Sequence, residues 1–281
     1  MSAVTYKSTL KPGTVETPLD LIFFRPCAYL FVRLALPTPL SANGMTIVGI
    51  LVGLIGASFF RFTDRPHVIL ASGLTLLYAV LDCADGQLAR ARGTASRFGR
   101  ILDGMSDYIV GTVSGLAISM HLYATLGRAG IPLAIGGLSS VILQGTLFDY
   151  FKNRYLALSH STYREGNDLA ETRAAYAQAT SFFVRAMYGI YVVFLRVQHA
   201  AGGSRSASTV SPERYAASLA PVARGWAWLG PSTHVLVMGL FACAGGLSHY
   251  VWMRLTLGNV LMVALYLEQF RRERALLTAN A

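Results

Sequence analysis

Residues 81–110 read LDCADGQLARARGTASRFGRILDGMSDYIV, and this stretch determines what the rest of the chain has to provide. Four aspartates stand in it between two apolar runs: Asp82, Asp85, Asp103 and Asp107. An acidic side chain in a membrane-spanning helix costs about 2.5–3.5 kcal/mol on insertion scales, so four of them require a compensating partner. Carboxylate oxygens are hard ligands, and they favour Mg²⁺ or Mn²⁺ as that partner.

The spacing of the aspartates predicts that they share one site. Asp82 and Asp85 are three residues apart and Asp103 and Asp107 four apart, so each pair lies on one face of a helix. Two helices can therefore direct two carboxylates each into a common space. The three cysteines (Cys27, Cys83 and Cys243) lie far apart without a C-x-x-C motif, which argues against a thiolate metal site or a disulfide framework.

The residues between the aspartates suit a phosphate-bearing substrate. Gly86 allows close approach to the backbone, and Arg90 offers a planar fork for phosphate. Ala89 leaves room in front of that arginine, and Gly99 keeps the second helix slim. Acidic helix caps that only solvate a loop would explain the aspartates, but not these residues.

In one-letter form the stretch is D-x2-D-G-x2-A-R-x8-G-x3-D-x3-D, which resembles the signature of the CDP-alcohol phosphotransferase (CDP-alcohol phosphatidyltransferase) family at every fixed position. The resemblance extends over about residues 38–155. It implies a donor such as CDP-diacylglycerol, two Mg²⁺ or Mn²⁺ ions, attack by an acceptor hydroxyl on the lipid-side phosphorus, and release of CMP. Known members are homodimers, so it also implies a homodimer.

The resemblance assigns roles to residues of this chain. The metal ligands would be Asp82, Asp85, Asp103 and Asp107, with Asp107 also the general base for the acceptor. The CDP-alcohol would be bound by Asn43, Thr46, Gly86, Arg90, Ser96 and Gly99. Asn43 and Thr46 follow Pro39 at a helix start, where Ser41 or Asn43 acting only as an N-cap is the alternative.

Composition places the chain in a membrane. Of its 281 residues 53% are hydrophobic and 14% are charged, with a mean hydropathy of +0.46. The formal charge of +10 comes from cations scattered along the chain, without a stripe interleaved with stacking aromatics. Anionic headgroups and a nucleotide diphosphate account for these cations better than nucleic acid, which we do not expect as a partner.

Six segments have the length and apolarity of membrane spans, and we place them at 44–61, 67–88, 99–124, 131–155, 227–247 and 250–270. Residues 19–37 are apolar but interrupted by Arg25, Pro26 and Arg33, which indicates an amphipathic helix at the interface with both arginines at headgroups. No signal peptide is expected before Arg25. The aspartates then fall at the cytoplasmic surface of what we expect to be a bacterial or archaeal plasma membrane.

Residues 179–197 are a seventh apolar candidate, but Arg185 and Arg196 share one face. With six spans, only Arg61, Arg65, Arg128 and Arg254 face outward, as the positive-inside rule requires. A seventh span would move the basic C-terminal residues outside. We therefore expect residues 159–225 to form a cytoplasmic insertion: a charged turn, a long interfacial helix, and then a Gly/Ser-rich loop.

The predicted fold is an all-α integral membrane protein with four regions. An arm and interfacial helix (1–37) precede spans one to four (38–158), the helical insertion (159–225), and spans five and six with a basic tail (226–281). Gly49-x3-Gly53 and Gly111-x3-Gly115 match the small-residue packing motif, which serves either a dimer or packing within one chain.

The acceptor is the least determined part of the prediction. The candidate site for an anionic acceptor, such as inositol phosphate or glycerol phosphate, consists of Lys152, Arg154, Arg97 and Arg100. Inositol is a further candidate acceptor. The alternative role of these cations is to anchor the cytoplasmic ends of the spans, as the positive-inside rule describes. Two rival functions are a cation transporter or channel that uses the acidic cluster, and a silent lipid-binding scaffold. A transport path would need polar residues across the bilayer, and the expected spans show almost none.

Overall fold

The computed structural model describes residues 5–10, 16–159, 169–202 and 210–278, and every regular element in them is helical. The chain divides into two compact units. Unit 1 comprises residues 1–142 and 231–259, and unit 2 comprises residues 143–230 and 260–281. The helix α5 (Gly130–Ser159) contributes its first part to unit 1 and its second part to unit 2.

Five segments of the described chain are long and apolar enough to cross a membrane: Ala42–Phe59, Arg65–Arg92, Ile101–Ser159, Pro212–Cys243 and Leu247–Thr278. At 1.5 Å rise per residue, a helical crossing of a 30 Å hydrocarbon core takes about 20 residues. The third segment has 59 residues and contains most of α4 together with the whole of α5. The chain is an integral membrane protein, as its composition predicts.

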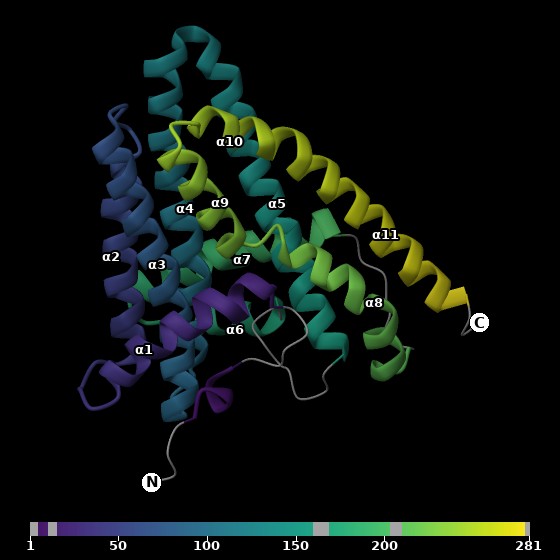
Figure 1. Ribbon diagram of the computed structural model, residues 1–281. Helices are drawn as coiled ribbons and strands as arrows, with labels where there is room; N and C mark the ends of the chain where they lie inside the picture. Colours follow the sequence, from purple (N-terminus) through teal and green to yellow (C-terminus); the bar gives the residue numbers. More distant parts are fainter. Residues whose placement is uncertain (1–4, 11–15, 160–168, 203–209, 279–281) are drawn as a thin grey trace. The chain divides into compact units, whose positions relative to one another are not determined.

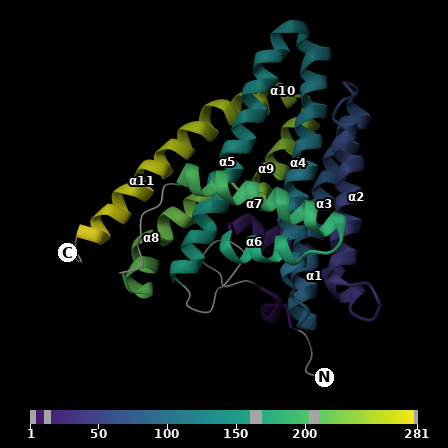
Figure 2. The ribbon, with the colours of Figure 1, turned by 180° about the vertical axis from the view of Figure 1, so that it is seen from behind.

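Three helices of unit 1 run alongside one another: α2 (Ala42–Phe59), α3 (Arg65–Arg92) and α4 (Arg97–Leu126) (Figures 1 and 2). Their first residues follow side-chain caps, since Ser41, Asp64 and Ser96 each accept a hydrogen bond from the N–H three residues later. Gly93 ends α3 with a φ of 64°, a left-handed conformation that glycine adopts without a Cβ penalty. Caps therefore set the ends of α3 and α4 that carry the four aspartates.

Small residues let α2 approach α3 closely. A Cβ on Gly53 would lie 2.9 Å from Tyr78 Cγ, and one on Gly56 would lie 2.6 Å from Leu74 Cβ and 3.0 Å from the backbone nitrogen of Thr75. The first predicted glycine motif, Gly49-x3-Gly53, thus packs within the chain. In the second motif, Gly115 packs against Leu138 of α5.

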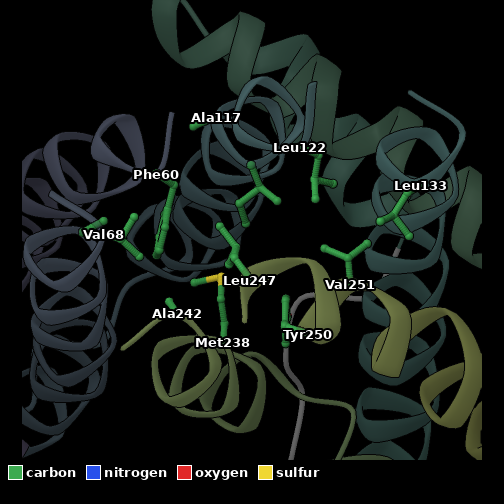
Figure 3. Packing of buried hydrophobic residues seen from close by; sticks show 12 residues of the cluster. Phe60, Val68, Ala117, Leu122, Leu133, Met238, Ala242, Leu247, Tyr250 and Val251 are labelled. Carbon is green, nitrogen blue, oxygen red and sulfur yellow. The ribbon is translucent and has the colours of Figure 1, made fainter. Parts of the chain in front are cut away.

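A hydrophobic core joins α2, α3, α4 and the start of α5 to the helices α9 (Pro231–Cys243) and α10 (Leu247–Met253) of unit 1. Figure 3 shows Met238 and Ala242 of α9 near Leu247 and Tyr250, with Phe60 and Val68 on one side and Leu133 and Val251 on the other. The cluster fixes the part of unit 1 that is remote from the aspartates.

The N-terminal helix packs across the end of α3 that carries the aspartates. It begins as a π-helical turn (η2, Asp20–Phe24) and continues as α1 (Arg25–Ala35), with Phe24, Ala28, Val32 and Ala35 buried at intervals of three to four residues. These residues pack on a set in α3 that includes Ala84 and Leu88. One prediction is wrong here: the Arg25 side chain does not extend to headgroups but is buried against Glu16, 2.7 Å away.

Unit 2 contains the second part of α5 with α6 (Leu169–Gln178), α7 (Phe182–Gly202), α8 (Pro212–Ala227) and most of α11 (Asn259–Thr278). Trp226 of α8 stacks on Phe151 of α5, with their ring centroids 4.9 Å apart. Glu273 of α11 is buried and bonds with Arg154, Tyr215 and Gln269. These contacts connect α5, α8 and α11.

The fifth predicted span differs from the observed helices, whereas the sixth, 250–270, lies within the helical segment Leu247–Thr278. Residues 227–247 are not one helix, because α8 ends at Ala227 and α9 begins at Pro231 after a turn at Trp228–Gly230. Proline lacks an N–H and disfavours a helical residue before it, which explains the break. In the sixth predicted span, Arg254 is 5% exposed and donates to the Tyr250 hydroxyl at 2.9 Å, so its side chain is buried.

The expected insertion is helical where the structure describes it. The seventh apolar candidate forms α7, which pairs with α6 and is not among the five candidate spans. Its exposed face carries Phe182, Ile190, Val193 and Val197, while Met187, Val192 and Leu195 are buried. The charged turn at 160–168 and nearly all of the Gly/Ser-rich loop lie outside the described residues.

The close crossing of α2 and α3 leads to a stability prediction. Gly56→Ala should destabilise the fold, because the new methyl group meets Leu74 Cβ and the Thr75 backbone, and overpacking costs about 1–3 kcal/mol. Gly73→Ala in α3 is the matched control, since no atom lies within 4 Å of its Cβ position and helix propensity favours alanine by about 1 kcal/mol. Thermal unfolding in detergent should show a lower Tm only for Gly56→Ala. Equal Tm values would contradict the close approach.

Candidate active site

Three of the four aspartates converge. Asp82 and Asp85 of α3 and Asp103 of α4 each offer a carboxylate oxygen, and these three oxygens lie within 4.8 Å of one another. Asp85 is 3% exposed, whereas Asp82 and Asp103 are half-buried. Like charges at such distances repel one another, so an ion of opposite charge would stabilise the group.

The helix α2 contributes to this group through Thr46. Its side chain is buried, and its hydroxyl donates a short hydrogen bond to Asp85 Oδ2. The same hydroxyl lies 3.1 Å from the Ala42 carbonyl oxygen one turn earlier in α2. Thr46, which the family resemblance predicts to be in the nucleotide site, therefore orients one of the clustered carboxylates.

Asp107 is held by residues that the sequence did not single out. The Tyr78 hydroxyl donates to Asp107 Oδ1 at 2.7 Å and lies 3.1 Å from the Ser106 hydroxyl. Ser106 in turn lies 3.1 Å from Asp82 Oδ1 and 2.6 Å from the Asp103 carbonyl oxygen. Tyr78 is one helical turn before Asp82 and Ser106 is next to Asp107, and that proximity in sequence was the only available signal.

Asn43 faces the helix that carries Asp103. A Cβ on Gly99 would lie 2.8 Å from Asn43 Oδ1 and 3.1 Å from Ser96 Oγ, so the absence of a side chain at Gly99 makes room for both. Ser41, and not Asn43, caps α2, by accepting from the Gly44 N–H at 3.0 Å. Ser96 caps α4 by accepting from the Gly99 N–H at 3.0 Å. The structure thus brings Asn43, Ser96 and Gly99 together.

Arg90 folds back along α3 over Gly86. A Cβ on Gly86 would lie 3.4 Å from Arg90 Nη1 and 3.6 Å from Nη2. The Nε of the same guanidinium donates to the Thr9 carbonyl oxygen at 2.6 Å. Thr9 belongs to a short 3-10 turn, η1 (Lys7–Thr9), which the sequence did not connect with the site.

The last turns of α3 hold the N-terminal segments by hydrogen bonds to backbone carbonyls. Gln87 Nε2 donates to the Arg25 carbonyl oxygen at 3.1 Å. Arg92 donates to carbonyl oxygens at the end of α1 and in the connection to α2, those of Ala35, Leu36, Thr38 and Leu40. The connection that precedes Asn43 and Thr46 is therefore tied to the end of α3.

Arg25 adds positive charge beside this end of α3. Burial alone would lower the pKa of its guanidinium, but the nearby Cys83, Glu16, Asp20 and Asp82 raise that pKa above its ordinary value. The side chain therefore stays charged where it is buried. Its charge partly offsets that of the acidic groups around it.

The structure describes the side chains of only two of the four proposed acceptor-binding residues. The side chains of Arg97 and Arg100 lie outside what the structure describes. In unit 2, Lys152 lies 3.2 Å from Asp149 and above the Phe148 ring. Arg154 pairs with the buried Glu273 through Nε at 3.1 Å and Nη2 at 3.4 Å. Within unit 2 these two cations thus have acidic partners.

The three-carboxylate group fits a divalent cation by its donor chemistry. Its oxygens are hard ligands, come from two helices, and are near enough to bind one ion together. Asp107, one turn of α4 beyond Asp103, is not among the three carboxylates. Its carboxylate accepts a hydrogen bond from Tyr78 of α3. The geometry is that of a membrane protein with a candidate carboxylate metal site on α3 and α4, beside an arginine suited to phosphate.

Comparison with known proteins agrees with this geometry. A family model described as CDP-alcohol phosphatidyltransferase matches residues 39–201. The chain belongs to this family. The match includes α2, α3 and α4 and therefore all the residues of the described carboxylate group.

The chain is also similar to a curated protein, the archaetidylinositol phosphate synthase of Pyrococcus horikoshii. The two sequences are 38% identical over 68 residues. The aligned region is 24% of this chain and 35% of the relative, so the chain spans about a third of the length of that protein.

The Tyr78 contacts predict a catalytic effect from outside the carboxylate group. Tyr78→Phe should reduce turnover about 10- to 100-fold, because outer-shell hydrogen bonds orient carboxylates near a metal and because Asp107 and Ser106 lose their common partner. Tyr123→Phe, at an exposed position of α4, is the matched control. Turnover and Tm should be measured for both variants. Unchanged turnover in Tyr78→Phe would show that its hydroxyl does not orient Asp107.

Proposed function

We propose that this protein transfers the phospho-alcohol group of a CDP-alcohol, with CDP-diacylglycerol as the favoured donor, to a hydroxyl of a small polar acceptor and releases CMP. The observation that carries the proposal is the convergence of Asp82, Asp85 and Asp103 within 4.8 Å. Membership of the CDP-alcohol phosphatidyltransferase family supports it. Such a reaction would belong to phospholipid biosynthesis.

The donor would bind where α2, α3 and α4 meet. Asp82, Asp85 and Asp103 would hold Mg²⁺ or Mn²⁺, which supplies positive charge to the diphosphate oxygens when it is bound. Arg90 provides bidentate donors for a phosphate beside Gly86. Asn43 and Thr46 border the space from α2, and Ser96 and Gly99 border it from α4. The family resemblance extends the metal set to Asp107 and the number of ions to two.

Asp107 is the proposed general base. Its carboxylate is one turn of α4 beyond Asp103, and a hydrogen bond from the Tyr78 hydroxyl fixes Oδ1. Oδ2 would then accept the proton of the acceptor hydroxyl while that oxygen bonds to the lipid-side phosphorus. The bond from phosphorus to the CMP oxygen breaks, and CMP leaves as the phosphate monoester. A positioned base typically contributes about 10²- to 10⁴-fold to such a step.

Inositol phosphate is the favoured acceptor, since the similar Pyrococcus protein is named as an archaetidylinositol phosphate synthase. Inositol and glycerol phosphate are the alternatives. An anionic acceptor needs cations, and Arg97, Arg100, Lys152 and Arg154 are the proposed ones. For Arg154 to take part, its guanidinium would have to share its donors with Glu273.

We also propose six membrane crossings, a cytoplasmic active site and a homodimer. The segment Ile101–Ser159 is long enough to cross the membrane twice and contains a turn at Gly127–Ala129. If it is counted as two spans, the five candidate segments provide six spans. The exposed apolar face of α7, with Arg185 and Arg196 exposed on an adjoining face, suits a helix at the cytoplasmic interface. The dimer rests on the family resemblance.

The reaction is tested by CMP release from CDP-diacylglycerol in detergent. We expect CMP with Mg²⁺ or Mn²⁺ and none with EDTA, because the carboxylates would repel the diphosphate without the ion. Inositol phosphate, inositol, glycerol phosphate, serine and choline should be compared as acceptors, and inositol phosphate should give the fastest release. Lack of metal-dependent CMP with every acceptor would overturn the proposed function.

Two conservative variants separate the metal ligand from the base. Asp107→Asn should lower turnover about 10²- to 10⁴-fold with little change in affinity for CDP, because an amide keeps the size but does not accept the proton. Asp85→Asn should weaken metal and CDP binding together, because it removes a carboxylate of the group that Thr46 orients. Competition binding with CDP at varied Mg²⁺ measures both. Equal losses of CDP affinity would make Asp107 chiefly a metal ligand.

A further inference from the structure

We propose that the N-terminal turn at residues 6–10 is a positioning element of the donor site, which holds the Arg90 guanidinium over Gly86 through the Thr9 carbonyl oxygen. The inference rests on the proposed function, in which Arg90 binds the diphosphate of the CDP-alcohol. The inference adds to the donor site a segment that precedes Arg90 by about 80 residues in the sequence. It lies outside residues 39–201, over which the family model matches.

The hydrogen bond to Thr9 determines where Arg90 points. The guanidinium is planar and its five N–H donors have fixed directions. When Nε donates to the Thr9 oxygen at 2.6 Å, the orientation of the two Nη groups is set as well, and they lie 3.4 and 3.6 Å from the Cβ position of Gly86. An arginine side chain otherwise loses about 1.5–2 kcal/mol of rotamer entropy when a ligand orders it. Ordering it before the donor arrives reduces that cost of binding.

A carbonyl acceptor suits this purpose better than a carboxylate would. A carboxylate partner would neutralise the arginine and compete with the phosphate for its charge. The Thr9 carbonyl is neutral, so this contact does not itself neutralise the guanidinium charge that would bind an anionic ligand. The contact therefore fixes direction without using the charge that a diphosphate requires.

The turn, which contacts α3, is also anchored by contacts within itself and to α1 and η2. The Thr9 side chain is fully buried, and its hydroxyl donates to the Tyr6 carbonyl oxygen at 2.7 Å. The Tyr6 ring packs edge-on against Tyr29 of α1 at 5.5 Å, and its hydroxyl lies 3.4 Å from the Leu21 carbonyl oxygen. The position of the Thr9 carbonyl thus depends on α1 and η2, which pack on α3 through their own apolar face.

A comparison with Arg92 shows that the contact of Arg90 has a separate role. Arg92 donates to several carbonyls at the end of α1 and in the following connection, among them Leu40 and Ala35, and so holds a structural junction. Arg90 is the arginine of the family motif, and its Nε donates to the backbone of the N-terminal turn. Loss of the turn should therefore impair ligand binding more than folding.

The test is a double-mutant cycle between the turn and Arg90. A variant that lacks residues 2–10 should bind CDP about tenfold more weakly, equivalent to about 1.4 kcal/mol, and raise KM for the CDP-lipid with a smaller change in kcat. In an Arg90→Ala background the same deletion should cause no further loss, because the group that the turn positions is absent. Tyr6→Ala, which loosens the turn without shortening the chain, should show part of the effect. Leu30→Ala, at an exposed position of α1, should not.

The outcomes distinguish this inference from the proposed function. If the unmodified protein neither binds CDP nor releases metal-dependent CMP, the proposed function fails, and this inference fails with it. If the unmodified protein is active but the deletion and Tyr6→Ala leave CDP affinity unchanged, only the inference fails. An equal loss of CDP affinity in the wild-type and Arg90→Ala backgrounds would also overturn it, because the turn would then act independently of Arg90.

Discussion

The structure of unit 1 depends on bringing several carboxylates together at the ends of membrane helices. Asp82, Asp85 and Asp103 approach within 4.8 Å, an arrangement that is unfavourable unless other groups offset the charge. Thr46 binds Asp85 directly, and Ser106 lies beside Asp82. These contacts require α2, α3 and α4 to converge, and the glycines of α2 allow this because a Cβ on Gly53 or Gly56 would clash with α3.

The end of α3 serves both as part of the site and as an attachment point for the N-terminal segments. Arg90 and Arg92 are two residues apart, so their side chains leave the helix in different directions. One reaches the turn that contains Thr9, and the other reaches the connection before α2. Gln87 adds a bond to the start of α1. Segments without any motif residue therefore limit the freedom of the residues that do belong to the motif.

Unit 2 shows how a buried charge can have a structural role. Glu273 is 3% exposed, and Arg154, Tyr215 and Gln269 bond to it from three helices. Removing one partner of such a pair leaves a buried charge uncompensated, which typically costs about 3–5 kcal/mol. If Arg154 also contacts an acceptor, as we propose, its guanidinium must therefore keep its bonds to Glu273.

The sequence by itself determined the membrane class, the carboxylate motif and most helix positions, because composition, periodicity and caps are local properties. Only the tertiary structure decided which distant groups meet the motif: Tyr78 and Ser106 at the aspartates, Asn43 at Gly99, and Thr9 at Arg90. It also decided that Arg25 and Arg254 are buried and that the fifth predicted span is broken at Gly230–Pro231. The physical reason is that helical spacing fixes the face on which a side chain lies, whereas its partner depends on packing between segments far apart in the chain.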